Sequence, residues 1–167
     1  MVTPKIRKRC EALVRTLDLP SPFSVDALVE KLSAQRGRPI RVHALPAGLA
    51  GEACGMWIAT DDGDDVYVEE KTTAFHREHI VLHEIGHLLC DHGGAADPDA
   101  GSAVSRLLPS LDPAMISRIL ARTDYTTEEE QEAELVATLI RSTAAMFAPS
   151  AARGARGNLE AALGIRE

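Results

Sequence analysis

Residues 83–87, with the sequence H-E-I-G-H, combine side chains and spacing that suit metal chemistry in this chain of 167 residues. Positions four apart stand on one face of a helix, so His83 and His87 can each offer a ring nitrogen to one Zn²⁺ at about 2.0–2.1 Å. Glu84 is rotated from His83 by about 100° and would flank the metal rather than bind it. A general base for a zinc-bound water belongs there, so Glu84 is the predicted catalytic residue.

The helix that carries this motif is predicted to span about residues 73–90 and is apolar around most of its circumference. A surface helix has an apolar stripe of limited width, so this helix is expected to be buried. Buried polar groups need partners, and a metal would supply one. Histidines satisfied within the core are the alternative. His76 and His79 extend the polar side and are expected to line a groove or to meet solvent, with a ligand role for His79 as a further alternative.

A third ligand is expected from another element, because a catalytic zinc usually has three protein ligands and one open position. Residues 127–140 predict a helix, since Thr127 followed by Glu130 matches a capping box and early carboxylates suit the positive end of a helix dipole. Glu132 differs from its neighbours because it points along the inward stripe of Leu135, Val136 and Leu139. A carboxylate aimed at a core needs a charged partner, so Glu132 is the predicted third ligand.

At these residues the chain resembles the ImmA/IrrE-type zinc metallopeptidases. Members of that family carry H-E-x-x-H on one helix and an E-A-N-x-F-A-like run on a later helix, whose Glu completes the site. Residues 132–137 of this chain are E-A-E-L-V-A, with Glu134 in place of the Asn and Val136 in place of the Phe. Glu134 is expected to face away from the site. The resemblance covers about residues 38–148.

The resemblance implies a gluzincin-like zinc site, with His83, His87 and Glu132 as ligands and Glu84 as the base. It also implies proteolysis of a specific partner protein, usually a helix-turn-helix transcriptional repressor encoded nearby, in a stress or mobile-element switch. The donor to the oxyanion stays open among Tyr125, His92 and Arg122. A competing hypothesis is a metal-binding protein without peptidase activity, which serves as the regulatory half of a two-gene pair.

Charge and composition limit the classes of partner that we expect this chain to bind. The chain has 18 basic and 25 acidic residues and a net charge of −7, which argues against nucleic acid as the main partner. Its basic residues near the start are expected on the solvated face of a first helix, with a docking patch as the alternative: Lys5, Arg7, Lys8 and Arg9. Three scattered cysteines and the lack of a long apolar run predict reduced thiols, a cytoplasmic location and no membrane segment.

The pattern along the chain predicts an α+β fold, namely a zincin-like (gluzincin-like) single domain that is mainly helical, with a small three-stranded sheet before the motif helix. Residues 1–148 are expected to form this domain, with an N-terminal helical part at 1–37 and the core at 38–148. Strands are expected at 39–45, 54–60 and 66–69, and a further helix is expected to start at Asp112. Residues 149–167 form an Ala/Gly/Arg-rich tail, either disordered or containing one short helix.

Overall fold

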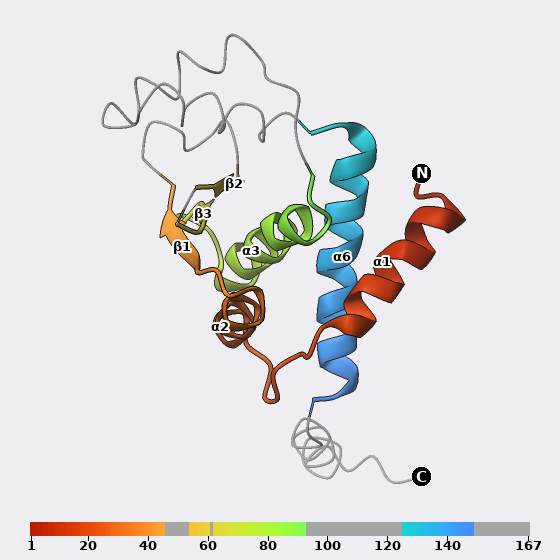
Figure 1. Ribbon diagram of the computed structural model, residues 1–167, viewed down its shortest axis with the longest axis horizontal. Helices are drawn as coiled ribbons and strands as arrows, with labels where there is room; N and C mark the ends of the chain where they lie inside the picture. The colour runs from red at the N-terminus through yellow and green to blue at the C-terminus, as the bar shows by residue number, and fades with distance from the viewer. Residues whose placement is uncertain (46–53, 61, 93–124, 149–167) are drawn as a thin grey trace, which may run out of the picture.

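The computed structural model describes residues 1–45, 54–60, 62–92 and 125–148 (Figure 1). Their elements are, in chain order, α1 (Pro4–Thr16), α2 (Val25–Arg36), β1 (Ile40–Ala44), β2 (Gly55–Ala59), β3 (Asp64–Val68), α3 (Ala74–Leu89) and α6 (Thr127–Met146). The predicted α+β class is confirmed, including a small sheet that precedes the motif helix. The helix expected at Asp112 and the tail at 149–167 lie outside the described residues.

The first two helices begin and end where local sequence signals place them. Thr3 caps α1 and is followed by a proline in the first turn, while Ser24 caps α2 by accepting a hydrogen bond from the backbone N–H of Ala27. Gly37 ends α2 with a φ of 60°, a left-handed conformation that glycine adopts without penalty. Ser24 and Gly37 therefore set the two ends of α2 through interactions within a few residues.

The three strands form one sheet in the order β1-β3-β2, with β1 parallel and β2 antiparallel to β3. β3 begins at Asp64, two residues before the predicted start at Val66. The reason is that the Asp64 side chain is buried and accepts hydrogen bonds from Arg38 Nε at 3.0 Å and Trp57 Nε1 at 3.1 Å. These partners satisfy a carboxylate that the alternating pattern alone would place in the turn.

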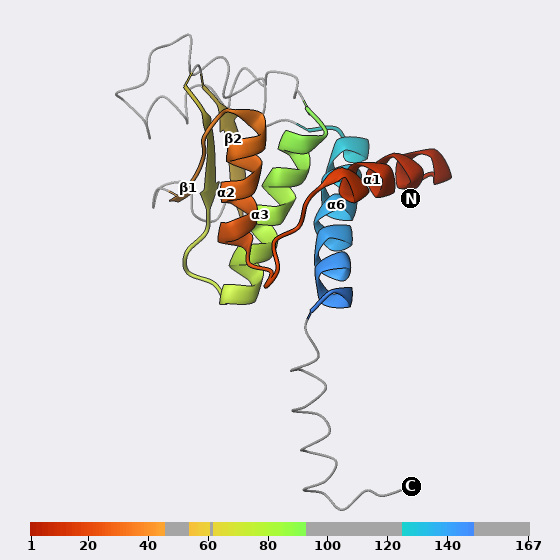
Figure 2. The same ribbon diagram turned by 60° about the horizontal axis from the view of Figure 1, so that its bottom comes forward.

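The helices lie in two layers beside the sheet (Figure 2). Helices α2 and α3 pack next to the strands, and α6 packs on the other side of α3 with α1 against it. The shared core contains fully buried side chains from the sheet, α3 and α6: Val66, Val68, Leu82, Ile85, Val136 and Ile140. α3 is thus covered on both sides between Ile80 and Leu88, as its apolar surface predicts, whereas its first turn is exposed, including Phe75 at 68%.

No helix within the described ranges has both the length and the apolar character needed to cross a membrane.

Candidate metal centre

The motif helix α3 has the predicted boundaries, with Thr73 as N-cap and Cys90 as C-cap. It places His83 and His87 one turn apart on the side that faces α6. The Nε2 atoms of the two rings lie 3.1 Å apart, and their ring planes are inclined by 75°. The two imidazoles therefore converge on one point, as the spacing predicts.

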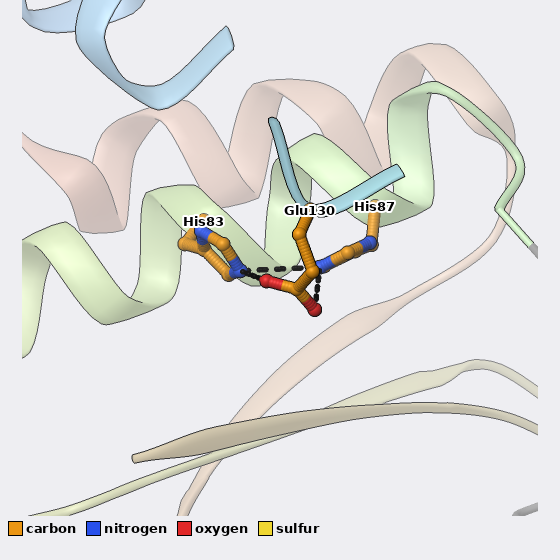
Figure 3. Close-up of side chains that lie close together, drawn as sticks. All are labelled: His83, His87 and Glu130. Atoms are coloured by element: carbon orange, nitrogen blue, oxygen red, sulfur yellow. Dashed lines mark hydrogen bonds and ion pairs between the residues drawn. The ribbon is translucent and has the colours of Figure 1, made fainter. Parts of the chain in front are cut away.

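The carboxylate that joins this pair is that of Glu130, on the first turns of α6. Its Oε2 lies 3.2 Å from His83 Nε2, and its Oε1 lies 3.5 Å from His87 Nε2. Figure 3 shows the three side chains pointing toward one another from the two helices. His83, His87 and Glu130 therefore form a group of ligand atoms close enough to share an ion.

The spacing of these atoms fits zinc. Two ligands bound tetrahedrally at about 2.0–2.1 Å stand about 3.3–3.4 Å apart, as simple trigonometry requires. The three observed separations are 3.1, 3.2 and 3.5 Å, with the two carboxylate contacts made by different oxygens of Glu130. Two nitrogens and one carboxylate are donor types that three-ligand zinc sites use.

His87 is held in the form that a metal needs. Its side chain is buried, and burial together with the neighbouring His83 and His92 lowers its pKa to about 3. The ring of Tyr125 stacks on it, with centroids 3.6 Å apart and planes inclined by 12°. A neutral imidazole keeps a lone pair for a cation, whereas a protonated one has none.

Glu84 is buried in a tight place between α3 and β2. A Cβ at Gly55 would lie 2.5 Å from Ile80 Cγ2 and 2.7 Å from Glu84 Oε1, so the glycine lets the strand pass close to the carboxyl group. Burial, followed by the negative charge of Glu130, raises the pKa of Glu84 to about 8, while the backbone N–H of Trp57 opposes this shift. Its Oε2 is buried without a hydrogen-bond partner among the described residues. An unsatisfied buried carboxylate oxygen is costly, so Glu84 is a candidate functional residue.

Glu132 faces inward as predicted, but the structure does not bring it to the histidine pair. Glu132 is buried, with 1% of the residue exposed, and its carboxylate binds the guanidinium of Arg9 on α1. Its Oε2 also lies 2.9 Å from His92 Nε2. Burial by itself would raise the pKa of Glu132, but the hydrogen bonds from Arg9 and His92 outweigh it and lower the pKa.

The difference between Glu130 and Glu132 starts at the helix cap. The predicted capping box used Thr127 and Glu130, whereas the observed one uses Thr126 and Glu129, one residue earlier. Glu129 bonds back to the Thr126 backbone N–H at 2.8 Å. The shift of one residue frees Glu130 from capping, so that its side chain can reach the histidines. The predicted role of Thr127 as N-cap is therefore wrong.

Glu134 was expected to face away, and this expectation is wrong. Its carboxylate lies 3.1 Å from His79 Nε2 and 3.4 Å from His83 Nδ1. His79 is thus tied to Glu134 rather than to the convergence point of the histidine pair. Glu134 therefore contacts Nδ1 of His83, while Nε2 of the same ring faces His87. A carboxylate on the second ring nitrogen is typical of metal-binding histidines.

The positions of Arg9 and His92 beside Glu132 were not predicted from the sequence. Arg9 was grouped with solvated basic residues, yet it crosses from α1 to Glu132. His92 was one of three open candidates for an oxyanion donor, yet it is buried with both ring nitrogens engaged, by His87 and by Glu132. The five-residue spacing of His87 and His92 across the end of a helix was the sequence signal that could have predicted their contact. Arg122, another such candidate, lies outside the described residues.

Comparison with known proteins adds no relative to this picture: no family model, no curated protein and no solved structure matches the chain.

Proposed function

We propose that this protein is a zinc-dependent endopeptidase that cleaves a specific partner protein. The observation that carries the proposal is the convergence of His83, His87 and Glu130 beside a buried Glu84 whose pKa is raised to about 8. H-E-x-x-H hydrolysis needs two components: a set of metal ligands, and a carboxyl group on the helix that carries the two histidines. The resemblance to ImmA/IrrE-type metallopeptidases supports the same reaction.

His83, His87 and Glu130 would hold the ion. Zinc, when bound, makes a water molecule more acidic and polarises a carbonyl group. Glu84 accepts the proton of the attacking water and later passes it to the leaving amine, the role of a positioned carboxylate in general acid–base catalysis.

An extended peptide segment is the substrate form that this site suits. β2 is an edge strand of the described sheet, and Glu84 lies directly against it at Gly55. A peptide that pairs with such an edge is held by backbone hydrogen bonds, which fixes one peptide group near the site. By the family resemblance, the partner protein proposed here is a helix-turn-helix transcriptional regulator.

The test combines metal analysis with cleavage assays. The Glu84→Gln variant should bind about one zinc per chain, as the wild type does, but should lose cleavage of the regulator encoded beside it. Glu78→Gln is the matched control, because Glu78 lies on α3 and its half-exposed side chain pairs with Arg141 at 3.6 Å. It should cleave like the wild type. Undiminished cleavage by Glu84→Gln would contradict the mechanism, and zinc binding without any cleavage by the wild type would favour the non-proteolytic alternative.

A further inference from the structure

The end of α3 folds back so that two histidines meet. Cys90 is helical, Asp91 has a φ of 53°, and the backbone N–H of His92 donates to the carbonyl of His87 at 3.0 Å. The N–H of Asp91 donates to Leu88 at 3.3 Å. These two bonds define a Schellman motif, which commonly places the side chains of the residues at 87 and 92 in contact. The way in which α3 ends therefore brings the His92 side chain onto that of His87.

The contact continues as a buried row of polar groups. His87 Nδ1 and His92 Nδ1 lie 2.9 Å apart, and His92 Nε2 lies 2.9 Å from Glu132 Oε2. All three residues are buried, and only Arg9 beyond them reaches solvent, with 61% of its side chain exposed. The row starts at the metal-facing ring and ends on α1, and all its described members are hydrogen-bonded.

Donor and acceptor counting assigns the protons in this row. If His87 Nε2 is to offer a lone pair to an ion, the ring proton must sit on Nδ1. That proton then donates to His92 Nδ1, which leaves the proton of a neutral His92 on Nε2, where it donates to Glu132. The negative charge of Glu132 is already balanced by Arg9, so His92 need not be charged. With His92 neutral and its proton on Nδ1 instead, a lone pair would face the carboxylate.

The same row already has its polar atoms paired. Cys90, His92 and Glu132 lie close enough to be considered as ligands of a second ion. However, both nitrogens of His92 are engaged by His87 and Glu132, and Arg9 already supplies the positive charge beside Glu132. Support of the neighbouring site is the remaining role for this cluster.

We infer that His92 is a positioning residue that holds His87 with its Nε2 lone pair toward the metal, and that Glu132 and Arg9 hold His92 in turn. The inference rests on the proposed function, because it assigns a role relative to the same metal site. Loss of a group that orients a metal-binding histidine typically weakens metal affinity by about 10- to 100-fold. Glu132 thus serves the site from behind His92, while Glu130 completes the ligand set.

The affinity test uses three variants and zinc competition with a chromogenic chelator. His92→Phe keeps a ring but removes both nitrogens, so zinc binding should weaken by about 10- to 100-fold. His92→Asn keeps an acceptor oxygen near the place of Nδ1 and should recover most of that loss. His43→Phe is the matched control, because His43 also pairs with a carboxylate, at 2.7 Å to Asp65, but on the sheet. Its affinity should equal that of the wild type.

A second measurement needs no variant. Ring ¹⁵N NMR of the wild type should show His87 protonated on Nδ1 and His92 protonated on Nε2. The Nε2-protonated form of His87, or equal zinc affinity in wild type and His92→Phe, would overturn the inference. These outcomes are distinct from failure of the peptidase proposal, which would appear as wild-type protein that binds zinc without cleaving its partner. A wild type that binds no zinc would overturn both.

Discussion

Gly86 of α3 lies against the backbone of Ala133 of α6 so closely that a Cβ on Gly86 would stand 2.7 Å from the Ala133 carbonyl oxygen. This approach lets a carboxylate of α6 reach imidazoles of α3 (Figure 3). The glycine in H-E-I-G-H therefore has a packing role between the two helices, in addition to the metal chemistry proposed for its neighbours. We therefore expect the helix separation at this point to control the distances among His83, His87 and Glu130.

Gly86→Ala should separate the two helices. The added methyl group meets backbone, which cannot rotate away, so overpacking should lower the free energy of unfolding by about 1–3 kcal/mol. Zinc affinity should fall as well, because Glu130 moves with α6. Urea denaturation and chelator competition measure the two effects. Thr138→Ala, at an exposed position of α6, is the control and should change neither. Unchanged zinc affinity in Gly86→Ala would show that the crossing distance does not control the site.

Glu130 and Glu132 should give different phenotypes when each is replaced by glutamine. Glu130→Gln removes a ligand and should abolish tight zinc binding while leaving the metal-free protein stable, since its side chain is half exposed. Glu132→Gln should weaken zinc binding less, but should also lower the melting temperature, because Arg9 and His92 lose a buried carboxylate. Metal content and thermal denaturation distinguish them. Glu128→Gln, exposed on the same helix, is the control. The reverse order of zinc affinities would restore Glu132 as the ligand that the sequence predicts.

Arg9→Met should destabilise the protein although Arg9 stands mostly in solvent. The substitution leaves the buried Glu132 carboxylate without its cation, which should cost about 1–3 kcal/mol after allowance for water that reaches an exposed guanidinium site. Arg7→Met is the matched control, since Arg7 lies on the same helix and only approaches Glu11 at 3.8 Å. Urea denaturation of both variants is the measurement. Equal losses in the two variants would show that the Arg9–Glu132 contact contributes nothing specific.

Asp65 should make the protein sensitive to acid. Burial by itself would raise the pKa of Asp65, but hydrogen bonds from Arg41 and His43 outweigh it and lower the pKa. A depressed pKa stabilises the fold above the unfolded value of about 4, and this contribution is lost as the pH falls through the folded value. Asp65→Asn should therefore be less stable at pH 7 and lose less stability below about pH 4. Urea denaturation across this range measures it.

The control for this pH dependence is Asp18→Asn, which removes a surface pair with Lys31 at 2.6 Å. Exposed pairs contribute little, so its stability profile should follow that of the wild type. An Asp65→Asn profile parallel to that of the wild type below pH 4 would contradict the role given to Asp65.

Local signals in the sequence determined the elements and the histidine pair. The cap at Ser24 and the glycine at 37 act within a few residues and set the ends of α2. The predicted span of the motif helix, about residues 73–90, agrees with α3 to within one residue at each end. The four-residue spacing of His83 and His87 needs only helical geometry to bring their rings together. Inward facing of Glu132 followed from periodicity for the same reason. These features depend on distances along the chain, which the sequence contains.

The tertiary structure decided which carboxylate meets the histidines. Neighbouring positions on a helix differ by about 100°, so the rotation and height of α6 against α3 select among Glu130, Glu132 and Glu134. That placement depends on the Gly86–Ala133 contact and on a cap one residue earlier than predicted. Arg9 meets Glu132 across 123 positions of sequence, a pairing that no local pattern encodes. Packing between distant elements, rather than spacing along the chain, therefore assigned each glutamate its partner.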